Sequence, residues 1–132
     1  MAYTHALVWL DHSEAHVIHL DESTFEKKTV HSPHGREHLH HRSGTVGSGH
    51  STDHAKFFAA IEAALGAVTE LLVVGPASAK SEFVKHAEKH DPKFAAKLVA
   101  VESIDHPSDR QLVAYARKKF IAADRMRGVP GT

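Results

Sequence analysis

Hydrophobic and polar residues alternate in the first part of the chain in a way that predicts three consecutive β-strands. Residues 5–12 place apolar side chains on both faces of an extended segment, which is typical of a strand covered on both sides. We expect a second strand over residues 15–20, joined to the first by a polar turn in a hairpin. The stretch 25–31 has Phe25 and Val30 near its ends and polar residues between them, which predicts a third strand at an edge of the sheet.

Helical and strand patterns alternate after that point. A buried stripe predicts a helix over residues 53–65, with Ser51 or Thr52 as N-cap and Gly66 as the stop. We expect the remaining elements as a strand at 70–75, a helix at 78–90, a strand at 98–103 and a helix at 108–127. The order β-β-β-α-β-α-β-α predicts an α/β fold of three layers with a mixed sheet, of the ribonuclease-H-like type.

Composition limits the class of protein. A chain of 132 residues with 42% hydrophobic and 24% charged residues has the size and balance of one globular domain. We expect a single domain over residues 1–127 and a flexible C-terminal tail at 128–132. With no long apolar run and no export signal, we expect a cytoplasmic protein without a membrane partner. The absence of cysteine excludes disulfides and cysteine-based zinc sites.

A long histidine- and glycine-rich loop is expected between the third strand and the first helix, over residues 32–52. An insert of about 20 residues without secondary structure usually carries a function or is disordered. Seven of the 14 histidines fall in or beside this loop: His31, His34, His38, His40, His41, His50 and His54. A loop that is merely polar and mobile also agrees with this composition.

Imidazoles titrate near neutral pH, bind zinc or nickel and stack on bases, so several functions are open to such a loop. A divalent metal, zinc or nickel, would be bound by His38, His40, His41, His50 and His54. In this set, His50 and His54 have the four-residue spacing of ligands on one helix face. No other cofactor is expected.

RNA is the other ligand that the loop suits. Glycines let a backbone approach phosphates closely, and arginines with partly protonated imidazoles supply positive charge. We expect RNA contacts from Arg36, His38, His40, His41, Arg42, Gly44, Gly47, Gly49, His50 and Lys56. The whole chain carries 16 basic and 16 acidic side chains, so we expect no DNA partner and no general polyanion binding.

Other candidate sites are weaker. A two-metal hydrolytic centre would need Asp11, Glu14, Asp21, Glu102 and Asp105 to converge. The stretch from Gly75 to Lys80 opens a helix after a strand, where a phosphate could bind, but it lacks the Walker spacing and favours a tight turn. His86 and His90 do not match the zinc-protease motif, and we expect them to be cationic at the end of their helix.

A resemblance to a known family is carried by the second half of the chain. Residues 70–120 contain ELLVVGPASAKSEFVKH and KLVAVESIDHPSDRQLVAYARKKF, and VHSPHGR at residues 30–36 precedes a glycine-rich loop. These segments resemble the middle domain of eukaryotic and archaeal peptide chain release factors. The whole chain is similar to a bacterial group of small proteins usually called translational machinery proteins.

The resemblance implies a role in translation. In release factors, a Gly-Gly-Gln tripeptide in the equivalent loop positions water against the ester that joins peptide to tRNA. Here residues 44–50 are GTVGSGH, and no glutamine precedes Gln111. We therefore expect a non-hydrolytic factor that binds the ribosome, through ribosomal RNA or tRNA, by its loop. A metal-binding protein and a protein-protein interaction module, including a homodimer, remain as alternatives.

Overall fold

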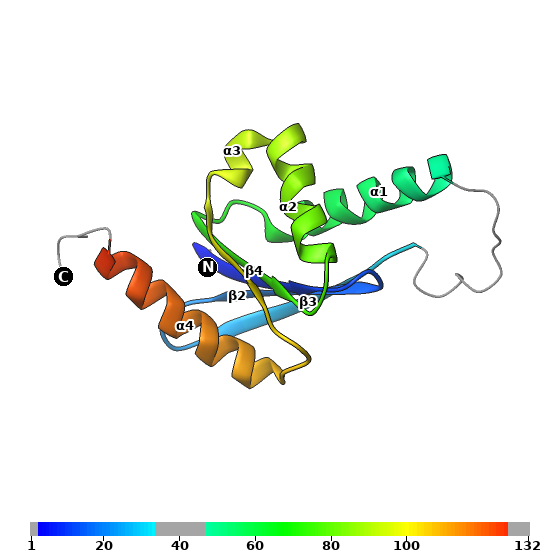
Figure 1. The fold of residues 1–132 in the computed structure, drawn as a ribbon. Coiled ribbons are helices and arrows are strands. Elements are labelled where there is room, and N and C mark those ends of the chain that lie inside the picture. The colour runs from blue at the N-terminus through cyan, green and yellow to red at the C-terminus, as the bar shows by residue number, and fades with distance from the viewer. Residues whose placement is uncertain (1–2, 34–46, 127–132) are drawn as a thin grey trace.

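The structure is a computed structural model and describes residues 3–33 and 47–126; for residues 47–53 and 123–126 it describes the backbone alone. It contains one five-stranded mixed sheet with helices on both faces, as shown in Figure 1. The strands are β1 (His5–Leu10), β2 (Glu14–Leu20), β3 (Phe25–His31), β4 (Glu70–Gly75) and β5 (Leu98–Ser103). The helices are α1 (Gly47–Leu65), α2 (Ala79–His90), α3 (Pro92–Ala95) and α4 (Asp109–Met126).

The strand order is β3-β2-β1-β4-β5, so the sheet is an antiparallel meander extended by two parallel strands. Val8 of β1 illustrates the strand register: it lies opposite Val17 of β2 on one side and Val73 of β4 on the other. The predicted hairpin and the edge position of β3 are confirmed. The predicted α/β class with a mixed sheet is confirmed as well.

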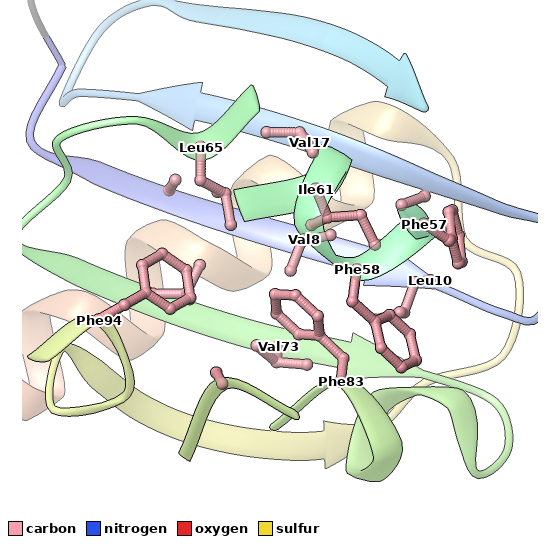
Figure 2. Close-up of a cluster of buried hydrophobic side chains, with 14 of the residues drawn as sticks. Val8, Leu10, Val17, Phe57, Phe58, Ile61, Leu65, Val73, Phe83 and Phe94 are labelled. Carbon is pink, nitrogen blue, oxygen red and sulfur yellow. The ribbon is translucent and has the colours of Figure 1, made fainter. Parts of the chain in front are cut away.

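The sheet separates two hydrophobic cores because alternate residues of β1 point to opposite faces. Val8 and Leu10 face α1, α2 and α3, where four phenylalanines fill the space between the helices and the sheet (Figure 2). Those phenylalanines are Phe57, Phe58, Phe83 and Phe94. Leu7 and Trp9 face the opposite core, which α4 closes with Leu112, Val113, Ala116 and Phe120. The central strand is therefore covered on both sides, as the sequence predicts.

Helix α1 begins at Gly47, six residues before the predicted start, so the prediction that the loop runs to Thr52 is wrong. Phe57, Phe58 and Ile61 are buried against the sheet and stabilise the helix. A helix stabilised in this way gains a hydrogen bond for each residue added at its N-terminus. Its end is as expected: Gly66 has φ +64° and donates its N–H to the carbonyl of Glu62 (3.0 Å). None of the helices in the described ranges meets the length and apolarity needed for a bilayer span.

Candidate functional site

The histidine-rich segment follows β3 at the edge of the sheet where the parallel strands β1, β4 and β5 end, here called the carboxyl edge. β3 also ends there, and Ser32 just beyond it is buried and donates its N–H to the carbonyl of Ser13 (2.8 Å). His54 of α1 lies at the same edge, because its ring centroid is 6.0 Å from that of His12 in the β1–β2 turn. Ligands of open α/β sheets commonly bind at this edge.

The predicted RNA-contacting residues fall into three groups. Arg36, His38, His40, His41, Arg42 and Gly44 lie outside the described residues. Gly47, Gly49 and His50 belong to the first turn of α1 and not to the loop that we expected. Lys56 is exposed on α1, half a turn beyond His54.

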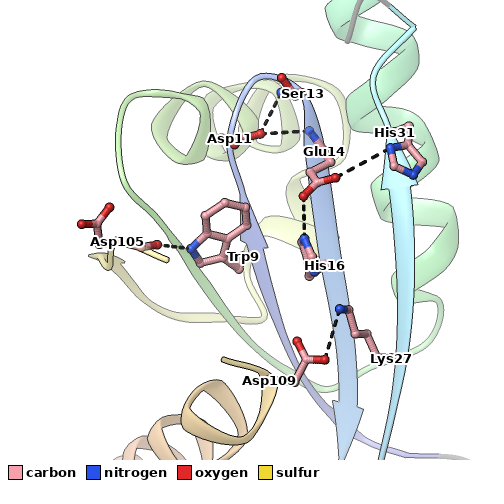
Figure 3. Close-up of polar contacts among 9 residues, drawn as sticks. All are labelled: Trp9, Asp11, Ser13, Glu14, His16, Lys27, His31, Asp105 and Asp109. Atoms are coloured by element: carbon pink, nitrogen blue, oxygen red, sulfur yellow. Dashed lines mark hydrogen bonds and ion pairs between the residues drawn. The ribbon is translucent and has the colours of Figure 1, made fainter. Parts of the chain in front are cut away.

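Trp9 organises the carboxyl edge on the α4 side of the sheet (Figure 3). Its indole N–H donates to the carbonyl of Asp105 (2.6 Å), which ties the segment after β5 to β1. The ring of His16 stands edge-on to the indole, with centroids 5.3 Å apart, and the ring of His106 lies 5.0 Å away. The indole is 4% exposed, so the two imidazoles form the outer surface of this aromatic group.

Glu14 joins His16 to one further imidazole, that of His31, at the same place. One carboxylate oxygen lies 2.9 Å from Nε2 of His16, and the other lies 3.8 Å from Nδ1 of His31 (Figure 3). His31 is the last residue of β3 and precedes the segment that leaves the sheet. Glu14 thus joins the side chain of His16 to that of His31 at this edge.

A row of aromatic rings begins at the carboxyl edge on the other face and continues along α2. His12 lies 3.2 Å from a carboxylate oxygen of Glu82, and the ring of His54 lies between those of His12 and Phe58. Phe58 in turn contacts His86, which is 4.6 Å from His90 between ring centroids. Burial, and secondarily the nearby His90, lower the pKa of His86. This shift disfavours the cationic form of His86 that the sequence predicted.

The acidic candidates for a hydrolytic centre have structural roles in the described part of the chain. Asp11 accepts hydrogen bonds from the N–H groups of Ser13 and Glu14 in the β1–β2 turn (2.8 and 2.9 Å). Asp21 does the same for the β2–β3 turn, and these backbone hydrogen bonds lower its pKa. Glu102 accepts hydrogen bonds from the hydroxyl of Tyr115 and the ammonium group of Lys119. Both lower the pKa of Glu102, and the bond from Tyr115 has the larger effect.

Among the described residues, no three histidine or carboxylate side chains come together as metal ligands. Of the five predicted ligands, only His54 has a described side chain, and it packs against His12 and Phe58. The side chains of His38, His40, His41 and His50 lie outside the described residues. Zinc or nickel binding thus stays a prediction about those four side chains, and native mass spectrometry of the untagged chain would test it.

The segment after β4 forms a tight turn. Lys80 is buried and its ammonium group donates to the carbonyl of Ala77, inside its own turn. Gly75 is required because a Cβ on it would lie 2.2 Å from the carbonyl oxygen of Leu10.

The basic residues of α4 are partly engaged within the fold. Arg117 donates to the carbonyls of Asp21 and Thr24 (3.0 and 3.3 Å), and Lys119 pairs with Glu102 (2.9 Å). Arg110 and Lys118 are exposed. The charge of this helix is therefore used in part to attach it to the turn between β2 and β3.

The carboxyl edge combines imidazoles with carboxylates. His12 pairs with Glu82, His16 with Glu14, and His106 with Asp105. The sequence pattern did not single out the group around Trp9. Pairing of Trp9 with His16 in the hairpin register is the signal that could have found it.

The architecture defines an α/β domain with a mixed five-stranded sheet, helices on both faces, and an insertion between β3 and α1. No protein-family model matches the chain, and no curated protein matches it in sequence. Its fold is nonetheless that of known domains.

The chain is similar to part of several solved structures. One is the Pelota of Archaeoglobus fulgidus, with a TM-score of 0.63 and 16% identity over 94% of this chain and 33% of that one. Another is Dom34 of S. cerevisiae, a translation termination-like factor, with a TM-score of 0.59 and 10% identity over 96% of this chain and 37% of that one. A third is the archaeal translation termination factor aRF1, with a TM-score of 0.53 and 16% identity over 94% of this chain and 39% of that one. The chain spans about a third of the length of these structures, and the likeness is one of fold.

Proposed function

We propose that this chain is a ribonuclease-H-like, translation-associated domain that binds the ribosome, through ribosomal RNA or bound tRNA, with residues 32–56. The likeness in fold to Pelota, Dom34 and aRF1, which extends over nearly the whole chain, is the observation that carries the proposal. The name of aRF1 and the description of Dom34 place both proteins in translation termination or a termination-like process. Residues 44–50 lack Gly-Gly-Gln, which supports a role without peptide release.

The location of the segment supports this function. Residues 34–46 connect β3 to α1 at the carboxyl edge, so their two ends are fixed by a buried Ser32 and by a helix packed on the sheet. Arg36 and Arg42 would neutralise phosphates, and the backbone amides at the start of α1 add a favourable dipole for an anion. Lys56 is exposed on the same helix.

Association with ribosomes in cells is the direct test. Polysome fractionation of a tagged chain is expected to show a ribosomal peak that shrinks at least about 10-fold in the Arg36→Ala, Arg42→Ala variant, because each lost phosphate contact weakens binding. The matched control is Lys89→Ala, Lys93→Ala, which removes two exposed positive charges at the far end of α2 and in α3.

The control variant should keep the ribosomal peak. Absence of any ribosomal peak for the unaltered chain would refute the proposal. Equal losses in the two double variants would show that overall charge, and not residues 32–56, is responsible.

A further inference from the structure

A groove of about 590 Å³ lies at the edge of the sheet opposite the carboxyl edge, between the second half of α4 and the ends of β1 and β2. Leu20, Phe120 and the ring of His5 line its apolar part, and the rings of His5 and Phe120 meet edge-on with centroids 4.6 Å apart. Phe25, which pairs with Leu20 across β2 and β3, is 40% exposed and extends this apolar surface.

The charged groups around the groove favour a positively charged partner. Arg117 lines the groove, where its guanidinium donates to two backbone carbonyls and its charge is offset by the nearby Asp21, so that Glu22 is left as the acidic group facing a partner. Asp21 and Glu22 are exposed at the rim, and the backbone hydrogen bonds that lower the pKa of Asp21 keep it ionised. The groove therefore suits an apolar side chain carried close to a lysine or arginine.

This chain presents such a combination in the wall of the groove itself. Ile121 lines the groove and is 54% exposed on α4, and Lys118, one turn earlier on the same helix face, is exposed as well. The two other large apolar side chains that are exposed in the described ranges do not have this combination. Phe25 has Lys27 on its strand face, but Lys27 is paired with Asp109 (3.1 Å), and Val101 is followed by Glu102.

We propose that the groove binds α4 of a second copy of this chain, so that Ile121 of each copy enters the groove of the other and Lys118 lies against Asp21 and Glu22. The inserted group and the groove that accepts it lie on one surface, which is the condition for a closed two-fold dimer. Ala114 and Ala122, both exposed on α4 near Lys118, allow the two helices to approach closely.

This dimer is independent of the proposed role in translation, because the groove and the described residues on either side of residues 34–46, such as Ser32 and His54, lie at opposite edges of the sheet. Loss of one property would therefore leave the other intact. Ribosome association and self-association can be measured on the same variants.

Sedimentation velocity of the purified chain over a range of concentrations tests the dimer. The unaltered chain should show a concentration-dependent dimer, and Ile121→Asp should weaken it at least about 30-fold, as expected of a central interface residue. The matched control is Val101→Asp, which alters an exposed valine on β5 and should leave the dimer unchanged.

Reversing the charges of the proposed ion pair distinguishes loss of the contact between the two copies from loss of folding. Lys118→Glu should weaken the dimer, and Lys118→Glu combined with Glu22→Lys should restore it, because the pair is re-formed with reversed signs. A chain that stays monomeric up to about 1 mM would overturn the proposal. A dimer that Ile121→Asp leaves unchanged would overturn it equally.

Discussion

Gly75 is the residue at which the fold leaves no room for a side chain. It ends β4 beside β1, and a Cβ would lie 2.2 Å from the carbonyl oxygen of Leu10 and 3.3 Å from its carbon. Both atoms are backbone in a central strand, so neither can move without displacing the sheet. Gly75→Ala is expected to lower the free energy of unfolding by about 3 kcal/mol or more, measured by urea denaturation.

Gly66 provides the comparison for that prediction. A Cβ there would meet nothing within 4 Å, and the cost arises from its φ of +64° alone. Gly66→Ala is expected to cost about 1 kcal/mol. An equal loss of stability in Gly75→Ala and Gly66→Ala would contradict the claim that a side chain at position 75 is excluded by a steric clash.

Single residues also show where sequence patterns reach their limit. Asp11 and Asp21 were candidates for chemistry because a carboxylate after a strand can ligate a metal. In the structure each one binds two backbone N–H groups of its own turn. The two roles need the same residue type at the same position, and only the direction of the side chain separates them.

At the scale of elements, the contact between α1 and the α2–α3 connection contains two carboxyl groups. The pKa of Glu62 is raised above the ordinary value for a glutamate. Burial is the largest cause, followed by the charge of Asp91 and by a hydrogen bond to Asp91. A raised pKa means that the folded state binds the proton more tightly than the unfolded state. The stability from this group is therefore present at low pH and is lost as pH rises through the folded-state pKa.

Glu62→Gln is accordingly expected to stabilise the chain at pH 7, by up to about 1 kcal/mol because the carboxyl group remains largely in contact with water. The gain should disappear near pH 4, where the wild-type carboxyl group is mostly protonated. Thermal unfolding at the two pH values measures this difference. Glu88→Gln on the exposed side of α2 is the control, and a gain that is equal at both pH values would contradict the assignment.

Elements with strong periodicity were predictable to within two residues at each end, and the two larger departures have physical causes. The strands β3, β4 and β5 have the predicted bounds. α3 was not predicted, since it is a single turn that Asp91 caps by accepting the N–H of Phe94 (3.3 Å) and that begins at a proline. The start of α1 was missed because glycines at 47 and 49 indicate a loop when local propensity alone is considered.

For the whole molecule, the order of strands and helices was sufficient to predict a mixed sheet with two covered faces. The carboxyl edge as a location also follows from the sequence, because the histidine-rich segment connects β3 to α1. The group of Trp9, His16, His106 and Glu14 does not follow from it. Those side chains come from β1, β2 and the segment after β5, and they meet only through strand register and the bond from Trp9 to Asp105.

Chemical footprinting of ribosomal RNA and tRNA tests most directly the claim that residues 32–56 contact them. Ribosomes would be probed alone, with the full chain, and with a variant in which residues 34–46 are replaced by a Gly-Ser linker of equal length. We expect nucleotides that the full chain protects and the variant leaves reactive. Identical reactivity with and without the full chain, or protection that persists with the linker variant, would contradict this account.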